Sequence, residues 1–176
     1  MEFDELLKKR HCVRKFDPAK KVTDDQVNKI LEAGRLAPSE GNVQPWYFIV
    51  INNKELIKEL EEGKMSAHNA STFSTASLII VTCIDTKIAS SVYKERGSEL
   101  YSKQSTAAAV QNMFLEVVNI SLGTCWIGAF DEVTVKKYLD LPQNLRPVAI
   151  MPIGYPAEDP HITERKGISE ISKIIE

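Results

Sequence analysis

The basic residues near the start of the chain are the first groups whose type and spacing could do chemistry. Six of the eight residues from 8 to 15 carry basic or titratable nitrogen, and Val13 and Phe16 could tie Arg10 and Arg14 to a core. Arginine binds phosphate oxygens through two parallel hydrogen bonds. Arg165 and the neighbouring lysine could add cations from the other end of the chain. The segment predicts a site for a phosphate dianion, and the alternative is a solvated charged face.

A second group of candidate residues lies in the short polar segment 37–46. Pro38 and Pro45 each restrict the residue before them, and Gly41 can adopt a positive φ angle. The segment therefore predicts a loop of defined shape between a helix and a strand, and the alternative is an ordinary connection made of turn residues. If the ligand has a flat ring with polar edges, the side chains of Ser39, Asn42 and Asn69 could hydrogen-bond to it, and Gly41 and Gly128 would let the backbone approach it closely.

Familiar catalytic motifs are missing from the sequence. It has no G-x-S-x-G, H-E-x-x-H, G-x-x-x-x-G-K or G-x-G-x-x-G pattern, and its three histidines have no recognisable partners. If the chain is an enzyme, we expect its reactive atom to belong to a cofactor. Flavin mononucleotide (FMN) has a phosphate and a ring with donor and acceptor edges, which the residues above could bind.

Composition limits the classes of partner. The chain has 176 residues, 43% hydrophobic and 26% charged, with a net charge of −2 and a pI near 6.0. These values are typical of one folded domain, residues 1–176, and give no general reason to bind nucleic acid or a membrane. The first residues do not resemble a secretory signal. Cys12, Cys83 and Cys125 are far apart and lack metal-ligand spacing, so we expect a cytoplasmic protein with reduced thiols and no metal.

Hydrophobic periodicity, together with residues typical of helix and strand ends, predicts the helices and strands. Helices are expected over the first nine residues, from the Thr23–Gln26 capping box to Pro38, and over residues 54–62, 106–122 and about 132–138, and strands over 47–51, 77–84 and 148–153. Residues 66–72 are expected to be a loop or irregular helix, and residues 85–105 a mobile element covering a site.

Two helical segments carry further expectations. Residues 106–122 are apolar nearly all round, which predicts a helix buried centrally or against another subunit, with Gly123 as the residue that ends it. Isoleucines at helical spacing near the end of the chain should dock that end onto another surface; they are Ile168, Ile171, Ile174 and Ile175.

Five motifs, taken in order, closely resemble those of the FMN-dependent nitroreductase family. They are residues 10–16 (RHCVRKF), residues 37–39 with 42–46 (APS and NVQPW), residues 106–113 (TAAAVQNM), residues 123–130 (GTCWIGAF) and residues 152–156 (PIGYP). The resemblance covers nearly the whole chain. It implies an α+β fold with a central mixed or antiparallel β-sheet flanked by helices. It also implies an intertwined homodimer with two FMN sites at the subunit interface.

The resemblance also implies roles for individual residues. The phosphate and the polar edge of the flavin would be held by Arg10, His11, Cys12 and Arg14, with Arg165 or Lys166 closing on the phosphate. The ring would be lined from the partner subunit by Pro38, Ser39 and Glu40, with Asn42 carried over from the same loop. Asn69 would bond the pyrimidine edge, and the backbone N–H of Gly128 or Ala129 would meet flavin N5.

The implied reaction needs no catalytic side chain. NADH or NADPH would deliver hydride to flavin N5, and a nitroaromatic, quinone or similar flat acceptor would then take its place in a ping-pong cycle. Alternatives are a protein that stores FMN or senses redox state, and related activities such as flavin cleavage or reductive dehalogenation. Two residues depart from the family pattern: Cys12 replaces the usual serine, and Ser105 replaces a common acidic residue.

Overall fold

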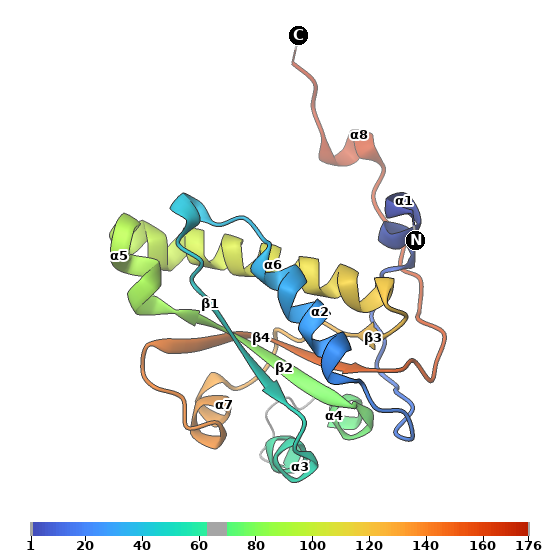
Figure 1. Ribbon diagram of the computed structural model, residues 1–176. Helices are drawn as coiled ribbons and strands as arrows, with labels where there is room; N and C mark the ends of the chain where they lie inside the picture. Colours follow the sequence, from blue (N-terminus) through green and yellow to red (C-terminus); the bar gives the residue numbers. More distant parts are fainter. Residues whose placement is uncertain (1, 63–69, 176) are drawn as a thin grey trace.

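A four-stranded antiparallel sheet forms the centre of the fold (Figure 1). The computed structural model describes residues 2–62 and 70–175. The strands lie in the order β1 (Trp46–Ile51), β2 (Leu78–Asp85), β4 (Leu145–Gly154) and β3 (Gly123–Thr124). Every neighbouring pair is antiparallel, which confirms the predicted α+β class and selects the antiparallel form of the sheet.

Helices cover both faces of this sheet (Figure 1). On one face lie α2 (Asp24–Arg35) and α6 (Ser102–Asn119), which also pack on each other. On the other lie α3 (Lys54–Glu62), α4 (Ala70–Thr75) and α7 (Glu132–Tyr138). The helix predicted over residues 54–62 is confirmed with those bounds, and the apolar helix is confirmed as a buried element.

Strand β2 separates the two halves of the core because successive side chains point to opposite faces. Ile79 and Val81 join the cluster beneath α3 and α7, whereas Leu78 and Ile80 join the cluster beneath α2 and α6. Seven of its eight residues are buried. A nearly continuous apolar run therefore forms this strand, as predicted for a strand covered on both sides.

The segment over residues 85–105 is helical. It forms α5 (Thr86–Arg96) and a π-helical turn, η2 (Gly97–Tyr101), which continues into α6. Gly97 permits this close packing, because a Cβ atom there would lie 2.2 Å from the backbone oxygen of Ala89. The predicted start of the long helix at Thr106 is therefore four residues late, since α6 begins at Ser102.

Side-chain caps set several helix ends as predicted. Thr23 and Gln26 form the capping box of α2, and Asp131 accepts hydrogen bonds from the first backbone N–H groups of α7.

The prediction that Gly123 ends the long helix is wrong. Ser121 takes the left-handed conformation after α6, with φ 61°, and Gly123 lies in β3. Gly123 is needed there for space, because a Cβ would come within 2.9 Å of the Val13 side chain.

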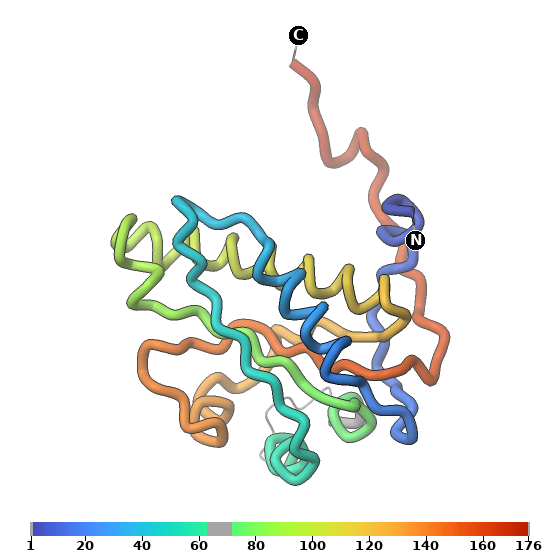
Figure 2. The backbone as a smooth tube through the Cα atoms, in the orientation of Figure 1, coloured from blue at the N-terminus to red at the C-terminus, as the bar shows by residue number. Residues whose placement is uncertain are grey.

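The chain ends in an arm, residues 157–175, that leaves the body of the fold beside α1 (Phe3–Lys9) and carries the short helix α8 (Ile168–Ile171) (Figure 2). The arm's isoleucines do not dock within this chain and are 69–86% exposed, so their predicted docking onto another surface stays a prediction. None of the described helices is long and apolar enough to cross a membrane.

Candidate functional site

Two buried anchors hold the basic segment in place. Val13 is 5% exposed and Phe16 is 2% exposed, as their spacing predicted. The backbone N–H of Val13 donates to the carbonyl of Thr124 at 2.9 Å, which ties the segment to β3. Arg10 ends α1, and its guanidinium lies over the Phe114 ring, 5.4 Å from the ring centre. Arg10 is therefore oriented by both the backbone and the core.

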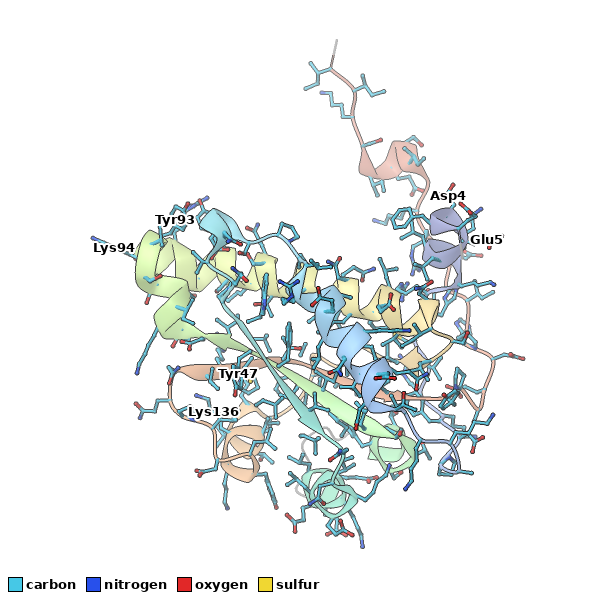
Figure 3. All side chains as sticks on the ribbon, in the orientation of Figure 1. Asp4, Glu5, Tyr47, Tyr93, Lys94 and Lys136 are labelled. Atoms are coloured by element: carbon cyan, nitrogen blue, oxygen red, sulfur yellow. The ribbon has the colours of Figure 1, made fainter. Side chains whose placement is uncertain are left out.

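Residues of the arm and of the segment around α1 line an open hollow of about 330 Å³, and three of the predicted phosphate ligands are among them. Figure 3 labels Asp4, another lining residue, on α1 beside the arm. Arg165 is oriented by its own neighbours, since its Nη1 donates to Thr163 Oγ1 at 2.7 Å and to two backbone carbonyls. Arg14 and Lys166 do not line this hollow. The lining residues are Asp4, Leu7, Lys8, Arg10, His11, Thr163 and Arg165.

Glu158 fixes the point at which the arm leaves the body. Its Oε1 accepts from the backbone N–H groups of Arg14 at 2.7 Å and Lys15 at 3.1 Å. The N–H of Ala157 also donates to the carbonyl of Lys15 at 3.0 Å. Sequence reasoning missed Glu158, because nothing in a polar tail marks one glutamate as the partner of two distant backbone groups.

The loop over residues 37–46 has the defined shape that its composition predicts. Gly41, Asn42 and Gln44 all have positive φ angles, at 51°, 57° and 51°. Ser39 Oγ accepts from the backbone N–H of Gln44 at 2.9 Å, and the Gln44 side chain donates to Asn42 Oδ1 at 3.1 Å. The short helical turn η1 (Glu40–Asn42) lies in the stretch between Ser39 and Gln44 that the first of these hydrogen bonds closes.

The same loop is docked on its own chain, far from the basic segment. The Ser105 hydroxyl donates to Glu40 Oε2, and the ring of Tyr93 in α5 packs against Gly41. Figure 1 shows this loop and α1 at opposite ends of the molecule. Within one chain, the structure therefore does not bring the loop's predicted ligands Pro38, Ser39, Glu40 and Asn42 to the cations. Asn69 lies outside the described residues.

Gly128 and Ala129 are exposed where the chain leaves the sheet edge. Just before them, Ile127 exchanges two backbone hydrogen bonds with Ile150, at 2.9 and 3.0 Å. The nearest atom that a Cβ at Gly128 would meet is Trp126 Nε1, at 4.0 Å. The backbone here is held firmly and is still open to the approach of a flat group.

A pocket of about 290 Å³ opens beside Gly128, between α6, β4 and the segment that follows β3. Its wall includes Thr106, which is 1% exposed and whose hydroxyl has no hydrogen-bond partner in the described part of the chain. Trp126 and Phe130 add aromatic surface. Sequence reasoning did not find this pocket, because it depends on packing between distant segments.

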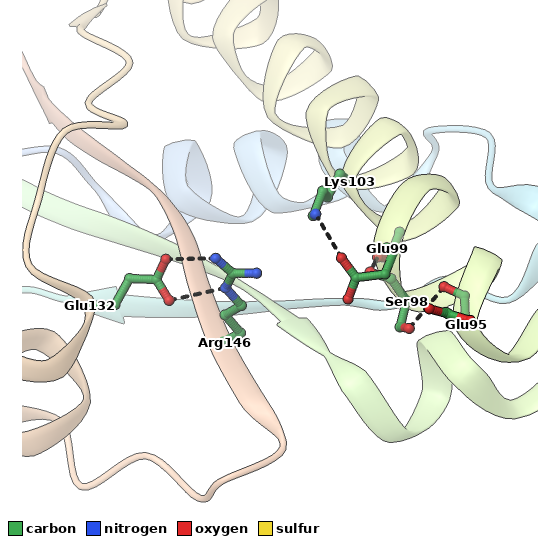
Figure 4. Close-up of polar contacts among 7 residues, drawn as sticks. Glu95, Ser98, Glu99, Lys103, Glu132 and Arg146 are labelled. Carbon is green, nitrogen blue, oxygen red and sulfur yellow. Dashed lines mark hydrogen bonds and ion pairs between the residues drawn. The ribbon is translucent and has the colours of Figure 1, made fainter.

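Charged residues at the rim of this pocket are paired (Figure 4). Arg146 donates two hydrogen bonds to the Glu132 carboxylate, at 2.9 and 3.0 Å, and Lys103 pairs with Glu99 at 3.3 Å. The hydrogen bonds from Arg146 lower the pKa of Glu132, and those to Glu132 raise the pKa of Arg146. With its charges paired, the pocket suits a flat apolar molecule with a polar edge better than an ion.

Two of the three cysteines meet next to the basic segment. Cys12 is half-buried and packs on the core cluster that contains Cys125, which is 3% exposed. Contact with the Cys125 thiol lowers the pKa of Cys12 to about 5, aided by the Trp126 backbone and by Arg14 and Arg10. The same contact raises the pKa of Cys125. No local sequence pattern indicates that these two thiols are neighbours.

Comparison with known proteins identifies the family. The model of the nitroreductase family matches residues 7–70 and 63–155. The chain belongs to the nitroreductase family. That membership makes it an oxidoreductase and confirms the resemblance carried by the five motifs.

Nitroreductase relatives match most of the chain. A protein from Methanothermobacter thermautotrophicus, named "Putative NADH dehydrogenase/NAD(P)H nitroreductase", is 30% identical over 164 residues, which cover 91% of this chain and 80% of the relative. The crystal structure of a nitroreductase family protein from Clostridium difficile is 30% identical with a TM-score of 0.83, covering 98% of both chains. Another, from Streptococcus pneumoniae, has a TM-score of 0.90 at 25% identity, covering 99% of this chain and 100% of the other.

Proposed function

We propose that this nitroreductase family member is an FMN-dependent NAD(P)H oxidoreductase that reduces nitroaromatics, quinones or similar flat acceptors in a ping-pong cycle. The observation that carries the proposal is the hollow in which Arg10, His11 and Arg165 meet. These residues are contributed by segments more than 150 positions apart, and Arg10 and Arg165 are each oriented by contacts with the protein itself. A phosphate dianion is the group that best matches two arginines with a histidine beside them.

The remaining groups also fit FMN. Gly128 and Ala129 offer open backbone to a flat ring, since a Cβ at Gly128 would meet little there. Arg10 and Arg165 would hold the phosphate, and the backbone N–H groups of Gly128 and Ala129 would face the ring. When bound, FMN would supply the redox chemistry, accepting hydride from NAD(P)H and passing electrons to the acceptor. The protein's task is binding, orientation and exclusion of water.

A second copy of the chain would complete the site. The loop that carries Ser39 and Glu40 is fastened to α5 and α6, at the far end of the molecule from Arg10. These residues could line the same flavin only if they came from a partner. The exposed isoleucines of the arm offer the apolar surface that a homodimer would bury.

We assign the acceptor to the pocket beside Gly128. Its apolar floor and aromatic wall suit a flat molecule, and the unpaired Thr106 hydroxyl can hydrogen-bond a quinone carbonyl or nitro oxygen. Replacing Thr106 with valine keeps the shape and removes the hydroxyl. We expect Thr106→Val to raise the KM for benzoquinone by about 3- to 10-fold, the value of one hydrogen bond, with FMN affinity unchanged. An unchanged KM would place the acceptor elsewhere.

The phosphate site can be tested by comparing FMN with riboflavin, which lacks the phosphate. We expect Arg165→Met to weaken FMN binding by about 10- to 100-fold and riboflavin binding hardly at all. Lys166→Met is the matched control, because Lys166 is the adjacent exposed cation and does not line the hollow. Titration followed by flavin absorbance or fluorescence gives both affinities. Failure of the wild-type protein to bind FMN, or equal losses for both ligands, would contradict the proposal.

Catalysis is tested separately from binding. The FMN-loaded protein is mixed with NADH or NADPH without oxygen, and flavin absorbance is followed. Rapid bleaching by either nucleotide, reversed by adding a quinone, is the expected result. A protein that binds FMN and is reduced by neither nucleotide would instead be a flavin store or a redox sensor.

A further inference from the structure

A backbone hydrogen bond between their chain neighbours, Val13 and Thr124, brings Cys12 and Cys125 together. The N–H of Val13 donates to the carbonyl of Thr124 at 2.9 Å, and Gly123 leaves no room for a side chain against Val13. A backbone hydrogen bond of this kind keeps two chain segments about 5 Å apart. A disulfide joins residues whose Cα atoms are about 4.4–6.8 Å apart, which is a spacing of the same size as that between the two bonded segments.

The two thiols differ in environment. Cys12 is partly open to solvent, whereas Cys125 is buried in the cluster that Cys12 packs against. Their side chains interact directly, and Arg14 and Arg10 contribute positive charge at Cys12. The thiolate is the reactive form of cysteine and is favoured next to cations. Cys12 is thus placed to react first, and Cys125 to react second.

We propose that Cys12 and Cys125 form an oxidisable dithiol that a peroxide converts to an intramolecular disulfide. The inference needs no flavin and stands apart from the proposed function.

The reaction balances in two steps. The Cys12 thiolate attacks one oxygen of hydrogen peroxide, the O–O bond breaks, and hydroxide leaves to take up a proton as water, giving a sulfenic acid at Cys12. The Cys125 sulfur then attacks the Cys12 sulfur, the S–S bond forms, and the sulfenic oxygen leaves as a second water with the Cys125 proton. Both sulfurs are oxidised by one electron each, and the peroxide is reduced by two electrons.

Cys83 provides a control within the same chain. It is fully buried in β2, and burial raises the pKa of its thiol to about 12. A thiol in this state is not expected to react with peroxide. The three cysteines therefore form one reactive pair and one inert residue.

The test is thiol counting on the full chain, once as purified and once after removal of any bound flavin. Protein is treated with hydrogen peroxide, quenched and unfolded, and its free thiols are counted. In the flavin-free wild type we expect three thiols to fall to one, with a Cys12–Cys125 cross-linked peptide that dithiothreitol abolishes. Cys83→Ser should fall from two thiols to none at the same rate.

Variants in the pair separate the two steps. Cys125→Ser should accumulate a sulfenic acid at Cys12 that dimedone traps, and Cys12→Ser should keep both of its thiols. Circular dichroism checks that each variant is folded, and Cys125→Ala replaces Cys125→Ser if needed. Three intact thiols in treated flavin-free wild type, a cross-link to Cys83, or equal thiol loss in Cys12→Ser would overturn the proposal.

Discussion

At the residue scale, the charge on Cys12 links stability to pH. The contact with Cys125 lowers the pKa of the Cys12 thiol from its ordinary 9.0 to about 5, and Arg14 and Arg10 act in the same direction. Between these two values the folded chain holds a thiolate, whereas the unfolded chain holds a protonated thiol. Unfolding therefore takes up a proton in this range, so the free energy of unfolding rises with pH.

We therefore expect the wild-type protein to gain stability relative to Cys12→Ser as pH rises from about 5 towards 9, and to lose that advantage as pH falls through about 5. Urea unfolding of both proteins at several pH values measures the difference. Cys83→Ser is the control and should follow the wild type below pH 9, because Cys83 stays protonated in both states. Parallel curves for wild type and Cys12→Ser would contradict the assigned thiolate.

Residue types were predictable from the sequence, and their spatial neighbours were not. The Arg10, His11 and Arg165 cluster follows from cation chemistry and the family motifs. The contact between Cys12 and Cys125 depends on the backbone hydrogen bond between Val13 and Thr124, which are more than a hundred positions apart. No local sequence pattern indicates such a contact.

At the element scale, the α5–η2 turn depends on the absence of a side chain at residue 97. The backbone oxygen of Ala89 occupies the space that a Cβ would need, at 2.2 Å. Backbone cannot move aside as a flexible side chain can. α5 and η2 would have to separate to admit even a methyl group.

Gly97→Ala should consequently destabilise the fold by about 1–3 kcal/mol or more, through overpacking. Gly128→Ala is the matched control, because its Cβ would enter open space, and its effect should stay within about 0.5 kcal/mol. Urea unfolding followed by far-ultraviolet circular dichroism compares the two variants. Equal stability of both would show that the turn can adjust.

Elements with a strong local pattern were predicted well. The helix Lys54–Glu62, the capped start of α2 and the buried strand β2 all follow from hydrophobic spacing and caps. The early start of α6 and the π-helical turn were missed, because they arise from Gly97 packing on Ala89. The end of α6 was misassigned because Ser121 accepts the left-handed conformation that a glycine would adopt more readily.

At the scale of the whole molecule, the residues predicted to bind the cofactor lie at two ends of the molecule, and the arm leaves its apolar side chains in solvent. The sequence predicted that the arm's isoleucines dock, and one chain offers them no surface. A single sequence cannot say which residues meet across a subunit boundary. This part of the site therefore stays a prediction.

We expect the protein to sediment as a dimer at micromolar concentration. Replacing Ile168, Ile171, Ile174 and Ile175 together by serine should weaken the dimer more than about a hundredfold, since each buried isoleucine contributes about 1.5–3 kcal/mol. Val133→Ser controls for loss of an exposed apolar residue outside the arm. Sedimentation velocity over a dilution series distinguishes the outcomes. A monomeric wild type, or an unchanged dimer in the serine variant, would contradict the proposed assembly.

The positive φ angles of Gly41, Asn42 and Gln44 have a consequence for binding. The loop is held by Ser39 and Ser105 through bonds made within one chain, so its shape is set before any ligand arrives. A molecule that lands against it restricts few torsions that were previously free, and little conformational entropy is lost on association. The loop is ordered during folding, so a ligand that used this surface would find it already organised.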